Sequence, residues 1–182
     1  MMIRTALAVA TVALLSTAAV SAADLIIPVT PEPIYESGGF SWEGLYVGAR
    51  AGGQWFTAAT YADVGGVAGF NFMASDTFLL GLEASADYTW NSTINRGWEL
   101  FANARAGFLV GDSALVYALG GLGVYTSSFG SVGLYQLGGG VEFAITDALT
   151  IRGELTGQGS MTGGAPRLFD SAKATAGLSY HF

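Results

Sequence analysis

After residue 42, apolar residues alternate with glycine or polar residues in one run after another, and this pattern constrains the fold more than any other feature. In residues 45–52 the odd positions are apolar, whereas in residues 78–87 the even positions are. Successive side chains of a β-strand point to opposite faces, so a period of two predicts strands with one apolar face. Eight such runs can be counted, and two of them, residues 66–72 and 115–125, are weaker. In the second, Gly120-Gly121 leaves a β-bulge and the choice of face open.

Three short turn signals divide the runs into pairs. They contain Asp76, Asp112 and Asp147, which are 36 and 35 residues apart. A hairpin of two strands of about 10 residues and one longer loop fills such an interval, and strands of this length suit a transmembrane barrel. The longer loops are predicted near residues 57–62, 89–97, 126–133 and 156–171. The sequence thus predicts an all-β fold, an eight-stranded antiparallel up-and-down transmembrane β-barrel over residues 42–182.

Alternation alone does not decide which face of such a barrel points outward. A secreted lipocalin-like barrel would turn its apolar face inward, and a membrane barrel would turn it outward. Charged residues make up only 12% of the chain, against about 25% in typical soluble proteins, and glycine occurs 27 times. The polar face is therefore made largely of small residues between a few charges, which suits a narrow lumen better than a water-facing surface. We expect the membrane arrangement.

The charges on the strands are balanced, which also favours an interior location. Buried charges must be paired, because desolvation costs several kcal/mol for each ion. A hairpin centred on Asp147 would set Glu142 opposite Arg152, although so few charges can also match by coincidence. The predicted barrel-interior charge network consists of Arg50, Glu83, Asp87, Arg105, Glu142, Arg152, Glu154 and Lys173.

Aromatic residues gather near the predicted strand ends, as in the two aromatic girdles of membrane barrels. Tyr46, Phe101 and Tyr117 are exceptions in mid-strand. The band at the short turns would contain Phe40, Trp42, Phe70, Phe72, Phe78, Phe108, Phe143, Tyr180 and Phe182. The band at the longer loops would contain Trp55, Phe56, Tyr88, Trp90, Trp98, Tyr125 and Tyr135.

The N-terminal segment has the features of a secretory signal. A short positive region, an apolar run from Ala6 to Leu15 and small residues up to Ala23 predict a cleaved signal peptide over residues 1–23. Residues 24–41 hold three of the four prolines, which predicts an extended, proline-rich periplasmic tail. Together with the barrel, this predicts export to the outer membrane of a Gram-negative cell.

Several motifs resemble, in their order, the small outer-membrane β-barrel proteins of alphaproteobacteria that are described as porin-like or outer-membrane immunogenic proteins. The motifs are Trp42-x-Gly44-x-Tyr46-x-Gly48, Gly69-Phe70-Asn71, Leu80-Gly81-Leu82-Glu83-Ala84, Arg105-x-Gly107-Phe108, Gly140-Val141-Glu142-Phe143-Ala144 and the final Tyr-x-Phe. The resemblance implies an eight-stranded outer-membrane barrel without catalytic residues. Members of this family often carry Arg-x-Arg on the fourth strand, where Asn103 replaces the first arginine here.

The C-terminus resembles the signal by which assembly machinery recognises outer-membrane barrels. Leu178, Tyr180 and Phe182 share one face of the last predicted strand and end the chain on an aromatic residue. The expected partners are therefore outer-membrane lipid and, during biogenesis, the barrel-assembly machinery. Homo-oligomers and other envelope partners stay open.

Other functions find little support in the sequence. The net charge of −7, without a Lys/Arg cluster, argues against nucleic acid binding. The chain has no cysteine and a single histidine, His181, which is expected at the periplasmic rim. Nucleophilic catalysis needs a base beside the nucleophile, so no enzyme, cofactor or metal is predicted.

The expected function is a non-enzymatic contribution to envelope integrity and surface presentation through the loops. One alternative is a narrow porin-like channel for small solutes, which the glycine-rich lumen keeps open. Another is an adhesin or ligand-binding barrel, for which the longest loop offers a candidate surface with Arg167, Leu168 and Phe169.

Overall fold

The computed structural model describes residues 40–92, 96–161 and 169–182, with Arg96 described for its backbone alone. The predicted signal peptide and most of the predicted tail lie outside these residues, so the domain borders stay predictions. The strands are β1 Gly44–Phe56, β2 Thr60–Met73, β3 Phe78–Trp90, β4 Arg96–Val110, β5 Ala114–Ser127, β6 Gly130–Ala144, β7 Leu149–Ser160 and β8 Ser171–His181. No helix long and apolar enough to cross a membrane occurs in the described residues.

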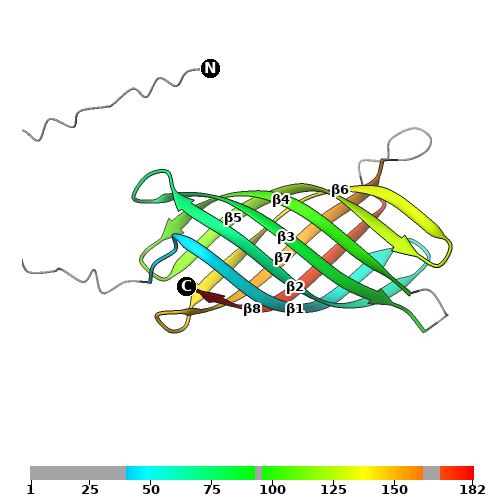
Figure 1. The fold of residues 1–182 in the computed structure, drawn as a ribbon, viewed down its shortest axis with the longest axis horizontal. Helices are drawn as coiled ribbons and strands as arrows, with labels where there is room; N and C mark the ends of the chain where they lie inside the picture. The colour runs from blue at the N-terminus through cyan, green and yellow to red at the C-terminus, as the bar shows by residue number, and fades with distance from the viewer. Residues whose placement is uncertain (1–39, 93–95, 162–168) are drawn as a thin grey trace, which may run out of the picture. The chain divides into compact units, whose positions relative to one another are not determined.

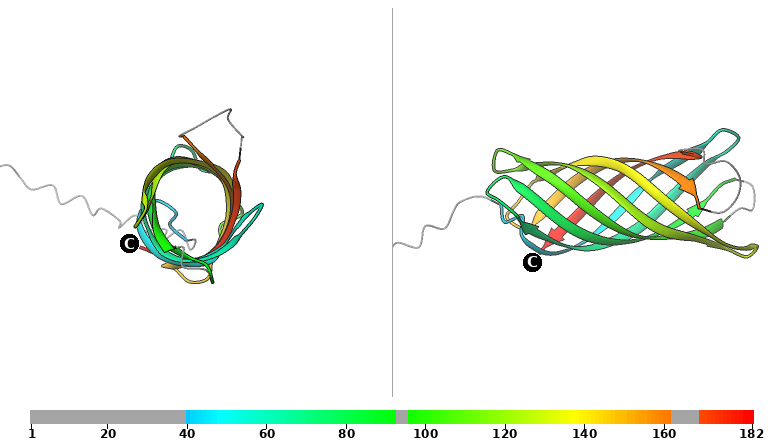
Figure 2. Two further views of the ribbon diagram at one scale, coloured as in Figure 1. Left: turned by 90° about the vertical axis from the view of Figure 1, so that its right-hand side faces the viewer. Right: turned by 90° about the horizontal axis from the view of Figure 1, so that it is seen from above.

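The eight strands form one closed sheet (Figures 1 and 2). Each strand pairs antiparallel with the next, and β1 pairs with β8 to close the ring. The view along the axis in Figure 2 shows this ring directly. The predicted eight-stranded antiparallel up-and-down β-barrel is confirmed.

The strands are staggered as well as closed. The register leads once around the barrel through Tyr46, Gly69, Glu83, Asn103, Gly121, Gln136, Gln158 and Ser171. It returns to β1 at Phe56, ten residues beyond its start at Tyr46. Such a stagger makes the strands tilt against the barrel axis. The tilt is visible in both side views (Figures 1 and 2).

The connections lie alternately at two ends of the barrel. The turn end holds residues 74–77, 111–113 and 145–148 together with the C-terminus, and the described connecting residues at the loop end are 57–59, 91–92, 128–129, 161 and 169–170. Two loops are therefore much shorter than the predicted segments 57–62 and 126–133. The strands run to 11–15 residues because their alternation continues with polar lumen-facing side chains. Gly130, at a φ of 131°, supports the tight connection between β5 and β6.

The weak run on β5 contains no bulge. The register on both sides passes through Gly120 and Gly121 without interruption. The odd positions face the lumen, and these include the buried residues Leu115, Tyr117 and Leu119. The alternation was hard to recognise there because both faces of the strand are apolar.

Most girdle aromatics lie on the outer face, but the assignments of Phe40 and Trp42 were wrong. The Trp42 side chain is buried at the turn end against Leu79, Leu115 and Tyr117, and its indole Nε1 donates to the Asp112 carbonyl oxygen at 3.3 Å. Phe40 packs on the Trp42 ring from the same side. The segment before β1 leads these two rings into the barrel end, where they cover apolar lumen residues.

Phe56 and Tyr125 were also assigned to a girdle, but both line a cavity at the loop end of the lumen. Among the mid-strand exceptions, Tyr46, Phe101 and Tyr117 all face the lumen. Of the aromatics that were assigned to the girdles, those that point outward with large exposed areas are Trp55, Phe70, Phe72, Trp90, Trp98, Phe108, Phe143, Tyr180 and Phe182.

Candidate functional site: the charged lumen

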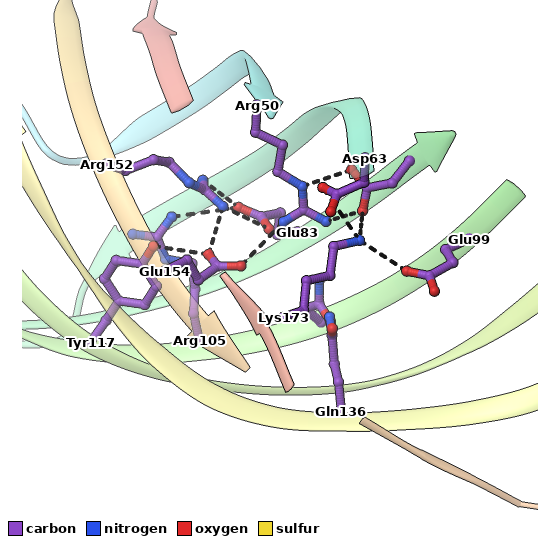
Figure 3. Close-up of polar contacts among 12 residues, drawn as sticks. Arg50, Asp63, Glu83, Glu99, Arg105, Tyr117, Gln136, Arg152, Glu154 and Lys173 are labelled. Atoms are coloured by element: carbon purple, nitrogen blue, oxygen red, sulfur yellow. Dashed lines mark hydrogen bonds and ion pairs between the residues drawn. The ribbon is translucent and has the colours of Figure 1, made fainter. Parts of the chain in front are cut away.

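The structure places all eight predicted network residues on lumen-facing positions. Each is buried, and the most exposed of them, Glu154, retains only 8% of its accessible surface. Alternation brings them there, because each strand turns every second side chain inward. Figure 3 shows several of these side chains extending from different strands toward one another.

Arg50 and Lys173 organise the half of the network that is nearer the loop end. Arg50 donates to both carboxylate oxygens of Asp87, from Nε at 2.9 Å and from Nη2 at 2.6 Å. Lys173 Nζ donates to Asp87 and to Glu99, each at 2.9 Å. Two-point pairing of an arginine with a carboxylate is among the strongest hydrogen-bonded arrangements in proteins.

Arg152 and Arg105 organise the half nearer the turn end. Arg152 binds both carboxylate oxygens of Glu83, at 2.7 and 3.1 Å. Arg105 Nη2 donates to Glu142 at 2.8 Å. Glu154 joins the halves, since it accepts from Arg50 at 3.1 Å and from Arg152 at 2.9 Å.

Two tyrosines complete the connections. The Tyr46 hydroxyl donates to Glu83 at 2.7 Å and accepts from Arg105 at 3.0 Å. The Tyr117 hydroxyl donates to Glu154 at 3.0 Å, and its ring lies 4.1 Å from the Arg105 guanidinium carbon. With these bonds the network is continuous from Glu99 to Glu142 and includes side chains from every strand except β2.

The predicted register of the β6–β7 hairpin is confirmed, since Glu142 lies opposite Arg152. The two side chains nevertheless take other ion partners. Arginine side chains reach toward the barrel axis and meet carboxylates from strands two places away, as in the Arg50–Asp87 and Arg105–Glu142 pairs. A cross-strand argument identifies neighbours on the wall, but it does not identify partners across a narrow lumen.

His181 lies at the predicted end but inside the barrel. Its ring is buried, stacks on Tyr46 at 5.2 Å between centroids, and places Nε2 3.2 Å from Glu142 Oε1. The expectation of a rim residue was wrong because His181 continues the inward-facing series of β8. The hydroxyl of Thr150 lies 3.5 Å from the same Nε2 atom. Since acid and hydroxyl approach one ring nitrogen, His181 has no geometry for relaying a proton between them.

Sequence reasoning missed two further lumen carboxylates, Asp63 and Glu99. Both are almost completely buried. They occupy inward positions near the loop end, where the predicted strands were ended too early. Extending the alternation of Arg105 backwards along β4 would have found Glu99. Among the described residues, no group of His, Cys, Asp and Glu side chains has an arrangement that could hold a metal ion.

Lumen glycines make room for these long side chains. A Cβ atom added to Gly69 would collide with the Tyr46 ring, one at Gly140 would lie 2.7 Å from the Tyr117 hydroxyl, and one at Gly81 would lie 3.0 Å from Arg105 Cγ. The glycine-rich inner face is therefore covered by side chains from neighbouring strands. It is not by itself a sign of an open pore.

The other predicted sites lie on the outer face or beyond the described residues. Leu178, Tyr180 and Phe182 all point outward, and the Phe182 amide donates to the Leu45 carbonyl oxygen at 3.0 Å. Of the candidate surface loop, Arg167 and Leu168 lie outside the described residues. The Phe169 ring covers Gly157 on the outer wall.

Comparisons with known proteins support the fold. No protein-family model and no curated protein sequence matches the chain. The N-terminal β-barrel domain of Pseudomonas aeruginosa OprF is similar with a TM-score of 0.52 and 18% identity, over 75% of this chain and 97% of that one.

Two further solved structures have the same architecture. Ail, the attachment invasion locus protein of Yersinia pestis, is similar with a TM-score of 0.51 and 14% identity, over 77% of this chain and 99% of that one. Neisserial surface protein A gives a TM-score of 0.53 and 10% identity, over 76% and 96%. At these identities the likeness shows the fold, a closed eight-stranded barrel of the kind found in bacterial outer-membrane proteins.

Proposed function

We propose that this chain is a non-enzymatic β-barrel protein of the Gram-negative outer membrane that contributes to envelope integrity and presents its loop end at the cell surface. The observation that carries the proposal is that charged side chains lie on the inner face of the barrel wall, whereas large apolar side chains are exposed on the outer face. On strand residues with described side chains, every charged group faces the lumen. The outer face instead exposes large apolar side chains such as Leu82, Phe108 and Leu155. A surface of this kind belongs in lipid, not in water.

Backbone pairing supports the same location. A segment that crosses a bilayer must satisfy its peptide groups internally, and a closed barrel does so without a free edge. The aromatic residues toward both ends of the outer face fit the two membrane interfaces. The structural likeness to OprF and Ail adds support at the level of the fold.

The lumen supports a closed barrel over a narrow porin-like channel. Eight strands enclose an interior that side chains just fill. Here arginine, lysine, carboxylate and tyrosine side chains cross that interior and bond to one another. Phe40 and Trp42 cover the turn end. A solute would have to displace paired charges in order to pass.

Export and assembly complete the proposal. Residues 1–23 would be removed as a signal peptide, and residues 24–41 would remain as a periplasmic tail. Leu178, Tyr180 and Phe182 would be recognised by the barrel-assembly machinery, and their outward orientation leaves them accessible to it. The ordered motifs favour the porin-like alphaproteobacterial family.

Reconstitution in planar bilayers tests the closed barrel. We expect no stable conductance from protein whose heat-dependent gel migration shows it to be folded, with a known porin as the positive control. In cells, loss of the protein should raise sensitivity to detergent, and re-expression should restore resistance. Reproducible single-channel steps would favour the porin-like channel, and unchanged sensitivity would refute the role in envelope integrity.

A further inference from the structure

A cavity of about 260 Å³ lies at the loop end of the lumen. Three aromatic side chains, Phe56, Tyr61 and Tyr125, take part in its lining, and the rings of Phe56 and Tyr61 contact each other edge to face. Two carboxylates, Glu99 and Asp170, line it as well. Glu99 also accepts from Lys173, so the cavity adjoins the charge network.

In the part of the lumen that the structure describes, negative charge exceeds positive charge beside this cavity. Among the described lumen residues, six carboxylates face four Arg and Lys side chains. Lys173 is shared by three of these carboxylates, Asp63, Asp87 and Glu99. Asp87 is already bonded to Arg50, so the excess negative charge falls on Asp63 and Glu99.

Asp63 is the clearest sign of this imbalance. It is 98% buried, yet neither carboxylate oxygen accepts a hydrogen bond, and Lys173 Nζ stays 3.8 Å from Oδ1. It is the next lumen-facing residue after Tyr61 and lies opposite Thr89, both of which line the cavity. An under-compensated buried carboxylate is costly, and a cation bound nearby would reduce that cost.

The lining selects the kind of cation. Aromatic faces attract organic cations, and ammonium groups that carry alkyl substituents gain both this attraction and apolar contact. The volume is below the usual range of about 300–1,000 Å³ for drug-sized ligands, which restricts the ligand to a small molecule. Anions would be repelled by the excess of carboxylates.

We propose that the loop-end cavity binds a small, freely diffusing substituted ammonium ion. Its alkyl groups pack against the three aromatic rings, and its charge faces Glu99. The cavity lies at the end of the barrel that carries the loops, which is the side from which a soluble ligand would enter. This binding is independent of whether the barrel supports envelope integrity.

Choline is a suitable probe, and 3,3-dimethylbutan-1-ol is its uncharged isostere. We would titrate each by calorimetry into the full protein in phosphatidylglycerol nanodiscs, which contain no amine headgroup. Saturable binding of choline at one site is expected, with binding of the alcohol at least tenfold weaker. No saturable binding of choline, or equal binding of the alcohol, would overturn the proposal.

Variants place the ligand within the lumen. Glu99→Gln should weaken choline binding at least tenfold, and Asp63→Asn at least threefold. Glu142→Gln is the matched control, because it removes a lumen carboxylate from the other half of the network and should leave the affinity unchanged. Gel migration verifies folding, and if Glu99→Gln does not fold, Asp63→Asn decides. Wild-type affinity in the deciding variant, or an equal loss in Glu142→Gln, would refute the assignment.

Discussion

Replacing Arg152 by methionine tests whether the lumen network stabilises the barrel. The side chain is buried and makes three hydrogen bonds, two to Glu83 and one to Glu154. Removing one partner of a buried ion pair typically costs about 3–5 kcal/mol. Without Arg152, Glu83 would keep its hydrogen bond from the Tyr46 hydroxyl and its ion pair with Arg105 at 3.7 Å. Glu154 would keep its ion pair with Arg50. Because neither carboxylate is left alone, we expect a loss near the lower limit, about 3 kcal/mol.

Urea titration in lipid vesicles measures this loss. Tryptophan fluorescence and gel migration report the folded fraction, and linear extrapolation gives the free energy of unfolding. Leu155→Met is the matched control, since it introduces the same residue on the outer face of the same strand. It should cost less than about 1.5 kcal/mol, as volume-conserving apolar changes do. A loss below about 1 kcal/mol for Arg152→Met would refute a stabilising role for the network.

Two further predictions concern a lumen glycine and the C-terminus. Gly69→Ala should destabilise the barrel by about 1–3 kcal/mol in the same titration, because its methyl group displaces the Tyr46 ring from Glu83 and Arg105. Gly153→Ala, which has open space around the added atom, should change stability little, and equal losses in the two variants would contradict the steric explanation. Deleting Phe182 should lower the amount of barrel inserted in cells more than it lowers the unfolding free energy of purified protein, whereas Phe182→Tyr should insert normally. Normal cellular insertion of the truncated chain would count against an assembly signal.

Much of the fold could be predicted because, in strands with charged residues on one face, the alternation shows which side chains point into the barrel. Arg152 and Glu154, or Arg50 with its neighbouring glycines, identify the inner face of a strand directly. The spacing of the turn aspartates then supplies the hairpin lengths and the register that sets Glu142 opposite Arg152. These are local properties, and each can be worked out from one or two strands.

The remainder depends on the closed barrel. The partner of Glu142 is Arg105 on a strand two places away, which follows from the width of the lumen and the reach of an arginine. The inward course of Trp42 depends on the apolar patch formed by Leu79, Leu115 and Tyr117, which no single strand contains. Asp63 and Glu99 were missed at strand ends, where pattern alone separates strand from loop poorly.

The stagger of ten residues has to be specified by the sequence, because neighbouring strands could also pair in a shifted register. A slip of any strand by two residues leaves each side chain on the face that it already occupies, so the hydrophobic pattern cannot tell the shifted pairing from the correct one. Such a slip moves a side chain about 6.6 Å along its strand. Arg50 would then lose the two-point contact with Asp87, and the pairs that depend on neighbouring strands would be displaced as well. The lumen charges thus specify the strand register. The alternation favours a barrel, and the ion pairs distinguish the observed pairing from pairings that are shifted by two residues.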